Sequence, residues 1–254
     1  MKVLDLFAGI GGFSLAAHWM GWETAAFVER EPFCQKVLRK NFGEDIEIHD
    51  DIFDFDGRPF RGAVDIITGG FPCQPFSAAG KRKGADDERY LWPEMLRTIR
   101  EVQPRYVVGE NVLGLLNQSR GMVFETVHTD LETAGYEVFT LVLPACAVGA
   151  QTRRDRVWIV GRLSHARGIR FGESEIVSKR QQSARRRPSQ RVVDALYRDD
   201  SRQYWRNESS FTGVVERLPG RMDRIRSERI RAVGNSIVPQ LAFEIFRAIE
   251  AADK

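Results

Sequence analysis

The chain has 254 residues and a formal net charge of +3 at pH 7, a length that accommodates one large domain, or one domain with a small appendage. No apolar run approaches the roughly 18 residues of a membrane span, and the first residues carry no signal-peptide pattern, so we expect a cytoplasmic protein with no membrane partner. Cys34, Cys73 and Cys146 are widely separated and lack a CxxC pair, which predicts neither a disulfide framework nor a metal site.

Short apolar strands alternate with helical patterns through the first two-thirds of the chain. This alternation is typical of an α/β fold, in which helices cover both faces of a parallel sheet. Strands are expected over residues 3–7, 24–29, 64–68, 105–109, 136–143 and 156–161, with a weak strand at 46–48. Helices are expected over residues 12–20, 32–41, 91–102 and 121–134. We therefore predict a first domain over residues 1–161.

Glycines and acidic residues follow the first strands. Residues 5–14, DLFAGIGGFS, end the first strand and open a helix. Glycines there let a ligand approach helix-end amides, although a tight turn without a ligand explains them too. Glu29 ends the second strand, where a doubly wound fold places an acidic residue on ribose hydroxyls. Asp51 follows the weak strand and suits an adenine amino group, unless it belongs to a solvated loop.

A thiol lies in the turn after the strand at 64–68. Residues 69–77 read GGFPCQPFS and place Cys73 between two prolines. A thiol presented at a turn can ionise and act as a nucleophile, whereas a structural cysteine lies in an apolar run, where its pKa rises. The sequence therefore favours a nucleophile, with a buried turn cysteine as the alternative.

Two further groups are expected near this thiol. Glu110 comes directly after the strand at 105–109, at the sheet edge where Cys73 also emerges. It can hold or donate a proton there, and an exposed carboxylate or helix cap is the alternative. Arg154 and Arg156 alternate onto one face of the last strand, where two guanidinium groups can clamp an anion or a carbonyl.

The positive charge is concentrated late in the chain. Residues 151–231 hold 21 Lys or Arg against 10 Asp or Glu, whereas the remainder holds 17 against 25. An arginine-rich flank beside an acidic body is typical of a surface that receives a polyanion, with a solvated segment as the alternative. We predict a short basic lobe over residues 162–221. Residues 222–254 then supply a turn, GNSIVPQ at 234–240, and a helix that packs back on the first domain.

Taken in order, these segments resemble the motifs of the cytosine-5 DNA methyltransferases, a family that uses S-adenosylmethionine. The glycine turn resembles the first motif, Glu29 the second, Asp51-Ile52 the third, residues 69–77 the nucleophile motif, residues 110–112 the glutamate motif, Arg154 and Arg156 the arginine pair, and residues 234–240 the last motif. The resemblance covers nearly the whole chain. It implies a Rossmann-like, doubly wound mixed sheet of the class I methyltransferase type, with a small basic recognition lobe.

The resemblance also implies roles for particular residues. Cys73 would add to carbon 6 of a cytosine flipped out of duplex DNA, which makes carbon 5 able to attack the methyl group. Glu110 would hydrogen-bond or protonate ring nitrogen 3, and Arg156, with Arg154, would hold the ring carbonyl or shield the thiolate. The implied S-adenosylmethionine residues are Asp5, Phe7, Ala8, Gly9, Gly11, Gly12, Glu29, Asp51, Ile52, Gly70, Pro72, Asn235 and Ser236. The implied DNA contacts are Gln74, Ser77, Lys81, Arg82, Asn111 and Val112.

The family further implies a cognate restriction endonuclease and a bacterial, archaeal or phage-infected host cell. The chain departs from the family pattern in its short recognition region, in Thr152 where glutamine is common and in Tyr90 where glycine is common. One alternative is a tRNA methyltransferase of the same fold, but its Cys-Phe-Thr signature does not occur here. The other is a non-enzymatic DNA-binding relict, which the joint presence of Cys73, Glu110 and the arginine pair disfavours.

Overall fold

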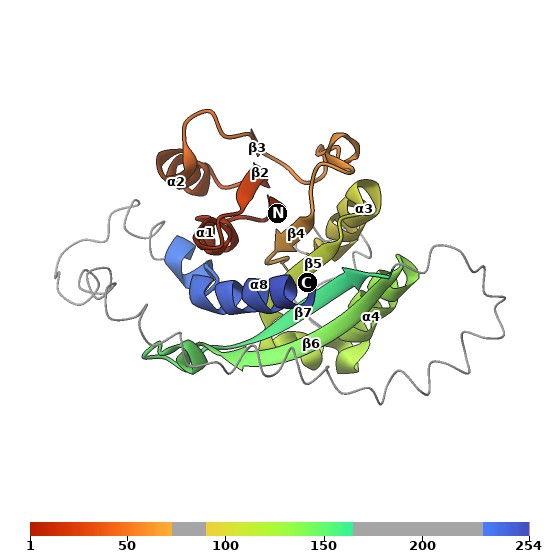
Figure 1. The fold of residues 1–254 in the computed structure, drawn as a ribbon. Coiled ribbons are helices and arrows are strands. Elements are labelled where there is room, and N and C mark those ends of the chain that lie inside the picture. The colour runs from red at the N-terminus through yellow and green to blue at the C-terminus, as the bar shows by residue number, and fades with distance from the viewer. Residues whose placement is uncertain (73–89, 165–230, 254) are drawn as a thin grey trace, which may run out of the picture.

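The computed structural model describes residues 1–72, 90–164 and 231–253. Within these ranges the strands form a seven-stranded sheet with the order β3-β2-β1-β4-β5-β7-β6 (Figure 1). The strands are β1 (Lys2–Leu6), β2 (Glu23–Val28), β3 (Ile48–His49), β4 (Ile66–Gly69), β5 (Tyr106–Val112), β6 (Tyr136–Pro144) and β7 (Asp155–Leu163). The expected α/β class is confirmed.

Direction of pairing divides the sheet into two parts. The pairs β2–β3, β1–β2, β1–β4 and β4–β5 are parallel, whereas β7 is antiparallel to both β5 and β6. The all-parallel sheet that the strand and helix alternation indicates is therefore wrong, and the mixed sheet implied by the family resemblance is confirmed. The cause is the short connection after β6, a 3₁₀ turn over Ala145–Val148, which returns the chain as a hairpin instead of through a crossover helix.

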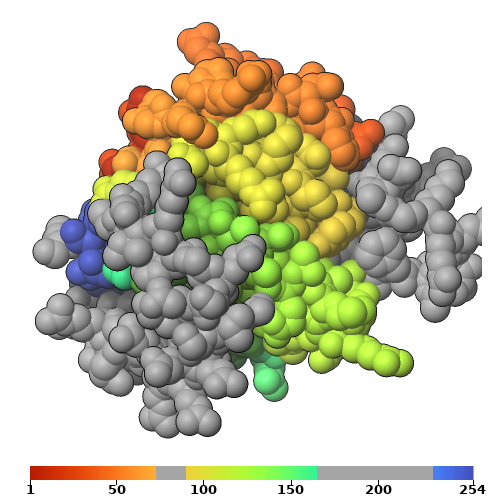
Figure 2. Space-filling model, turned by 90° about the vertical axis from the view of Figure 1, so that its right-hand side faces the viewer, coloured from red at the N-terminus to blue at the C-terminus, as the bar shows by residue number. Residues whose placement is uncertain are grey.

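Helices cover both faces of the sheet. They are α1 (Gly12–Trp19), α2 (Pro32–Phe42), α3 (Trp92–Val102), α4 (Met122–Thr133) and α8 (Pro239–Asp253), with 3₁₀ turns at Arg58–Phe60, Leu113–Leu116 and Gln118–Gly121. α2 has Pro32 at its first turn, where the missing amide hydrogen costs no helical bond. Figure 2 shows α3 in yellow between the orange segment that holds the Arg58–Phe60 turn and the green α4.

The alternation of side chains along the strands builds two large buried clusters, and a smaller third one lies around Ala8, Phe27 and Leu38. On one face, Val3 and Trp158 of the sheet pack with Phe13 of α1 and Phe246 of α8. On the other face, the strand side chains that point in the opposite direction pack with α3 and α4 around Trp92. Because α8 lies against α1, the last described segment returns to the face of the sheet that α1 covers (Figure 1).

Two strand boundaries differ from expectation in ways that concern the site. β5 continues through Val112, because its antiparallel pairing with β7 extends to Val112 opposite Arg156. Glu110 therefore lies inside a strand, and the expectation that it comes just after the strand is wrong. β3 is reduced to two residues at the edge of the sheet.

Several predictions fall on residues that the structure does not describe. They concern Cys73, Gln74, Ser77, Lys81, Arg82 and residues 165–221 of the basic lobe. The division into domains stays a prediction. Within the described ranges, no helix is long and apolar enough to cross a membrane. In the same ranges, no group of three or more His, Cys, Asp or Glu side chains is arranged to hold a metal ion.

Candidate active site

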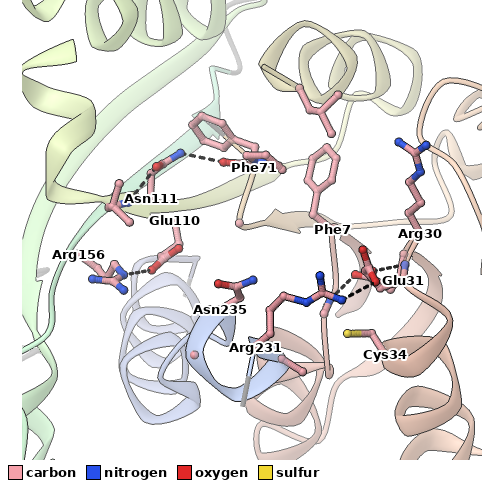
Figure 3. Close-up of a pocket in the computed structure, with 18 of the residues that line it drawn as sticks. Phe7, Arg30, Glu31, Cys34, Phe71, Glu110, Asn111, Arg156, Arg231 and Asn235 are labelled. Atoms are coloured by element: carbon pink, nitrogen blue, oxygen red, sulfur yellow. Dashed lines mark hydrogen bonds and ion pairs between the residues drawn. The ribbon is translucent and has the colours of Figure 1, made fainter. Parts of the chain in front are cut away.

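A pocket of about 780 Å³ opens at the carboxyl ends of β1, β2, β4 and β5. This is the edge at which ligands of doubly wound sheets bind. Three groups of residues line it (Figure 3). They come from the strand ends and the start of α2 (Phe7, Gly9, Glu29, Arg30, Glu31, Phe33, Cys34), from the segment after β4, the start of α3, and β5 and β7 with the residue before β7 (Gly70, Phe71, Pro72, Leu91, Glu110, Asn111, Val112, Arg154, Arg156) and from the segment before α8 (Arg231, Ala232, Gly234, Asn235).

The glycine turn separates into residues that face the pocket and residues that allow close packing. Phe7 and Gly9 line the pocket, with φ angles of 53° and 56°. Gly11 does not line it, and a Cβ there would lie 2.5 Å from a ring carbon of Phe42 in α2. Gly12 opens α1, and a Cβ there would lie 2.6 Å from Cγ1 of Ile237. These two glycines therefore serve the packing of the turn against its neighbours.

Asp5 lies beneath this turn instead of in the pocket. Its side chain has no exposed surface, and its two oxygens accept hydrogen bonds from the hydroxyls of Ser14, at 2.9 Å, and Thr68, at 2.8 Å. Burial raises the pKa of Asp5 to about 7, because a charged carboxylate is costly away from water, although both hydroxyls act to lower it. Asp5 thus ties β1, α1 and β4 together, and direct contact between Asp5 and a ligand has no support in this geometry.

Glu29 forms the opposite wall from β5 and receives two backbone amides. Its Oε2 accepts from the Gly9 amide at 2.6 Å, and its Oε1 accepts from the Glu31 amide at 2.7 Å. The side chain is buried, and burial raises its pKa against the lowering effect of these amides. Each carboxylate oxygen can accept a further hydrogen bond, so Glu29 has the capacity to receive ribose hydroxyls from the pocket.

Asn111 holds the backbone that leads to Cys73. Its Nδ2 donates to the carbonyl oxygen of Phe71 at 2.9 Å, and its Oδ1 accepts from the Val112 amide at 2.9 Å (Figure 3). The Leu91 amide donates to the Pro72 carbonyl oxygen at 3.2 Å. The chain is therefore fixed at the two residues that immediately precede Cys73. The amide group of Asn111 is used inside the protein, which makes it a positioning group for this turn more than the DNA contact that the family resemblance implied.

Glu110 and Arg156 form an ion pair on the β5–β7 wall. Nε of Arg156 lies 3.0 Å from Oε1 of Glu110, and Nη1 of Arg156 donates to the Asp155 carbonyl oxygen at 2.9 Å. Burial raises the pKa of Glu110 to about 7, although Arg156 and Arg154 act to lower it. A carboxyl group with this pKa exchanges a proton near neutral pH, as an acid or base catalyst requires.

Arg154 and Arg156 do not share a strand face, so the expected alternation is wrong. Arg154 precedes β7 and has a φ of 36°, outside the extended conformation on which alternation depends. Its Nη2 donates to the carbonyl oxygens of Gly234, at 2.8 Å, and Ser236, at 2.6 Å. Both arginines nevertheless line the pocket.

The sequence reasoning missed several pocket residues around the start of α2 and the segment before α8. Arg30, Glu31, Phe33 and Cys34 follow Glu29 directly, so the carboxyl end of β2 was a usable signal for them. Arg231 carried no such signal, because its Nη2 reaches Oε2 of Glu31, 200 residues away in the chain, at 3.3 Å (Figure 3). Burial raises the pKa of Cys34 to about 12, with Glu29 and Glu31 adding to the effect, so this thiol is not an activated nucleophile.

The structure brings six of the thirteen expected cofactor residues to the pocket. Phe7, Gly9, Glu29, Gly70, Pro72 and Asn235 line it, as do the expected groups Glu110, Asn111, Val112, Arg154 and Arg156. The expected residues that do not line it are Asp5, Ala8, Gly11, Gly12, Asp51, Ile52 and Ser236. Asp51 accepts the Phe53 amide at 3.1 Å, and Ile52 is buried in the core beside α3.

Comparison with known proteins gives a consistent result. Residues 1–219 match the sequence model of the family described as C-5 cytosine-specific DNA methylase. The chain is 39% identical over 160 residues to the Type II methyltransferase M.Eco47II of Escherichia coli, covering 62% of this chain and 38% of that relative. It is 39% identical over 176 residues to the Type II methyltransferase M.AquIA of Picosynechococcus, covering 63% of this chain and 71% of that relative.

Solved structures are similar over different extents. A crystal structure described as a prophage-encoded DNA modification methyltransferase of E. coli has 27% identity and a TM-score of 0.55, covering 64% of this chain and 47% of that one. DNMT2 of Spodoptera frugiperda has 16% identity and a TM-score of 0.66, covering 98% of this chain and 99% of that one. The second likeness shows a shared fold. The match spans only 38% of the length of M.Eco47II and 47% of the prophage-encoded methyltransferase.

Proposed function

Since the chain belongs to the C-5 cytosine-specific DNA methylases, we propose that it transfers a methyl group from S-adenosylmethionine to carbon 5 of a cytosine flipped out of duplex DNA. The observation that carries this proposal is the ion pair between Glu110 and Arg156. The carboxyl group of Glu110 has a pKa of about 7 and lines the pocket. Pro72, the residue before Cys73, lines the same pocket.

The residues at the β2 end of the pocket fit S-adenosylmethionine. Glu29 offers carboxylate oxygens to ribose hydroxyls, Phe7 offers an aromatic ring to a purine, and Asn235 offers an amide. When bound, S-adenosylmethionine supplies an electrophilic methyl group on its sulfonium sulfur. Phe7, at the end of β1, lies across the pocket from Glu110 (Figure 3), which supports a methyl donor at one end of the pocket and a base at the other.

The residues of this chain would act on cytosine in a defined order. The Cys73 thiolate adds to carbon 6 while protonated Glu110 donates to ring nitrogen 3, which places the displaced electron pair on an enamine-like carbon 5. Carbon 5 would take the methyl group as the bond from that group to the sulfonium sulfur breaks, with S-adenosylhomocysteine as the leaving group. A base would then remove the carbon 5 proton, the double bond would re-form and the Cys73 thiolate would leave, while ring nitrogen 3 returns its proton to Glu110, which restores the enzyme. Arg156 would stabilise the ring carbonyl and keep Glu110 oriented.

The proposed function implies two partners. Duplex DNA is the proposed substrate, and a restriction endonuclease that recognises the same site is a proposed partner, because the relatives are named as Type II methyltransferases.

A transfer assay tests the function. The protein is incubated with S-adenosylmethionine labelled in its methyl group and with either duplex DNA or tRNA, and the label is located by nucleoside analysis. We expect label on carbon 5 of cytosine in DNA and none with Cys73→Ser. Label in tRNA alone would replace DNA by RNA as the substrate, and DNA binding without transfer would support the relict.

A trapping assay tests the role of Cys73 separately. With a 5-fluorocytosine in the methylated position, the fluorine cannot leave as a proton does, so the adduct to Cys73 should persist through denaturing electrophoresis. Cys73→Ser should form no such adduct. Because Cys73→Ser retains the pocket residues, it should still bind S-adenosylhomocysteine, which serves as the folding control.

A further inference from the structure

Arg154 adopts a conformation that directs it away from its strand neighbours. Its φ of 36° lies in the left-handed region, which disfavours residues with a side chain. Burial lowers its pKa, and Arg156 adds to this effect. Both the backbone conformation and the loss of hydration have a free-energy cost, so the contacts of Arg154 must offset them.

The contacts that Arg154 makes are to the end of a helical turn. Residues 231–235 are helical, and the Ser236 amide donates to the Ala232 carbonyl oxygen at 3.0 Å. The Val233 carbonyl oxygen also accepts the Ser236 amide, at 3.3 Å, whereas the last carbonyl groups of a helix have no amide of their own helix to accept from. Nη2 of Arg154 donates to two carbonyl oxygens at this end, those of Gly234 and Ser236. A guanidinium group at a helix C-terminus satisfies these carbonyls and complements their partial negative charge.

This helical turn and the residues after it, 231–237, are here called the C-terminal wall. Arg231, Ala232, Gly234 and Asn235 of the wall line the pocket, and Figure 3 shows Asn235 and Arg231 projecting into it from the segment before α8. On its other side, Ile237 fits against Gly12, at which a Cβ would lie 2.6 Å from Ile237 Cγ1. The wall therefore touches the glycine turn, and Arg154 ties it to β7.

We propose that Arg154 is a positioning residue that fastens the C-terminal wall over the methyl-donor end of the pocket, instead of a residue that contacts the cytosine ring. This inference rests on the proposed function for the identity of the donor. Its Nε is buried without a hydrogen-bond partner among the described residues, and its charge acts on Glu110. Arg154 therefore links the two ends of the pocket, because one guanidinium both holds the wall and lies near the ion pair.

The first measurement is hydrogen exchange of the wall in the protein without ligand. Arg154→Met keeps the length and apolar stem of the side chain and removes both hydrogen bonds. We expect faster exchange in peptides that cover residues 231–238 and unchanged exchange in β4 and β5. Arg154→Lys retains a cation and should restore part of the protection. Arg153→Met is the matched control, because Arg153 is exposed and pairs with Asp155.

The second measurement is the affinity for S-adenosylhomocysteine by calorimetry, without DNA. A wall that is ordered for only a fraction of the time reduces apparent affinity by that fraction, so we expect Arg154→Met to bind about tenfold more weakly. The KM for S-adenosylmethionine should rise by a similar factor of about ten, with kcat changed less. Arg153→Met should match the unmodified protein in both.

Either of two results would overturn the proposal, one from hydrogen exchange and one from kinetics and binding. Unchanged exchange over residues 231–238 in Arg154→Met removes the fastening role. A fall in kcat with unchanged affinity for S-adenosylhomocysteine would assign Arg154 to the ring instead. If hydrogen exchange is fast throughout the Arg154→Met protein, the variant is unfolded, and Arg154→Lys is used instead. The same comparison, of residues 231–238 with β4 and β5, then tests the fastening role. If the unmodified protein binds no S-adenosylhomocysteine, the proposed function fails, whereas the exchange experiment still decides whether Arg154 holds the wall.

Discussion

Glu29 and Glu110 are buried carboxylates at two ends of one pocket, and the protein holds them in different ways. Glu29 accepts two backbone amides, from Gly9 and Glu31. Glu110 is held by a side chain, the guanidinium of Arg156. Backbone amides fix the orientation of a carboxylate and only donate to it, which suits a binding group. Among the described residues the ion pair engages one oxygen of Glu110, so the second oxygen can exchange a proton with a substrate.

The origin of this difference lies in the sheet. Glu29 follows β2 in the parallel half, where the turn after β1 brings the Gly9 amide to it. Glu110 lies in β5, whose antiparallel partner β7 places Trp158 opposite it and Arg156 near it. The parallel half therefore supplies backbone amides, and the antiparallel half supplies a cation. We infer that binding and proton transfer are divided between the two halves.

The strongest test of this division is Glu110→Gln. Glutamine keeps the shape of the side chain but cannot donate a carboxyl proton, so we expect single-turnover methyl transfer to fall by about 10²–10⁴, with affinity for S-adenosylhomocysteine unchanged. In the unmodified protein, the contribution of protonated Glu110 should be lost as pH rises through about 7, and the residual rate of Glu110→Gln should lack this step. Equal pH profiles for the two proteins would remove Glu110 as the acid.

The matching change at the other end is Glu29→Gln. One of the two backbone amides would then face the Nε2 hydrogens of glutamine, and ribose hydroxyls would lose an ionised acceptor. Loss of charge-assisted hydrogen bonds should weaken binding of S-adenosylhomocysteine about tenfold or more, with kcat at saturating donor affected less. Glu23→Gln, at an exposed carboxylate, is the control. Unchanged affinity in Glu29→Gln would contradict the assignment of this end to the donor.

A third buried carboxylate, Asp5, extends the comparison because it accepts two hydroxyl groups, those of Ser14 and Thr68, together with the Ser14 backbone amide. Its folded pKa of about 7 lies above the ordinary value of 3.8, so the folded protein binds more protons than the unfolded chain between these pH values. The stability that protonated Asp5 provides is complete below pH 3.8 and is lost as pH rises to about 7. The associated slope is at most about 1.4 kcal/mol per pH unit.

Asp5→Asn should therefore flatten this part of the stability profile, as measured by urea unfolding at a series of pH values. Asparagine can accept from one hydroxyl and donate to the other, so the turn should keep its hydrogen bonds. Asp54→Asn, at an exposed carboxylate in the loop after β3, is the control and should leave the slope unchanged. An unaltered profile in Asp5→Asn would mean that Asp5 keeps an ordinary pKa in the folded protein.

Much of the pocket was predictable, because its residues are close in sequence to strand ends. Glu29, Pro72 and Glu110 follow or end apolar runs, and the carboxyl ends of parallel strands meet at one edge, whereas Asn235 was predicted only through the family resemblance. The exceptions share a cause. Gly11 and Asp5 belong to the same glycine-rich motif as Gly9, but their roles depend on Phe42 and Thr68, which the motif does not contain.

The sequence by itself determined the family, the α/β class and the edge of the sheet where the site lies, because these depend on the order of motifs and on local apolar patterns. Only the tertiary structure decided how individual side chains are used. The direction of β7 places Arg156 beside Glu110, and the return of the chain at Gly234 gives Arg154 its two carbonyls, 80 and 82 residues away. Such contacts depend on how separate elements pack, a property that local spacing does not encode.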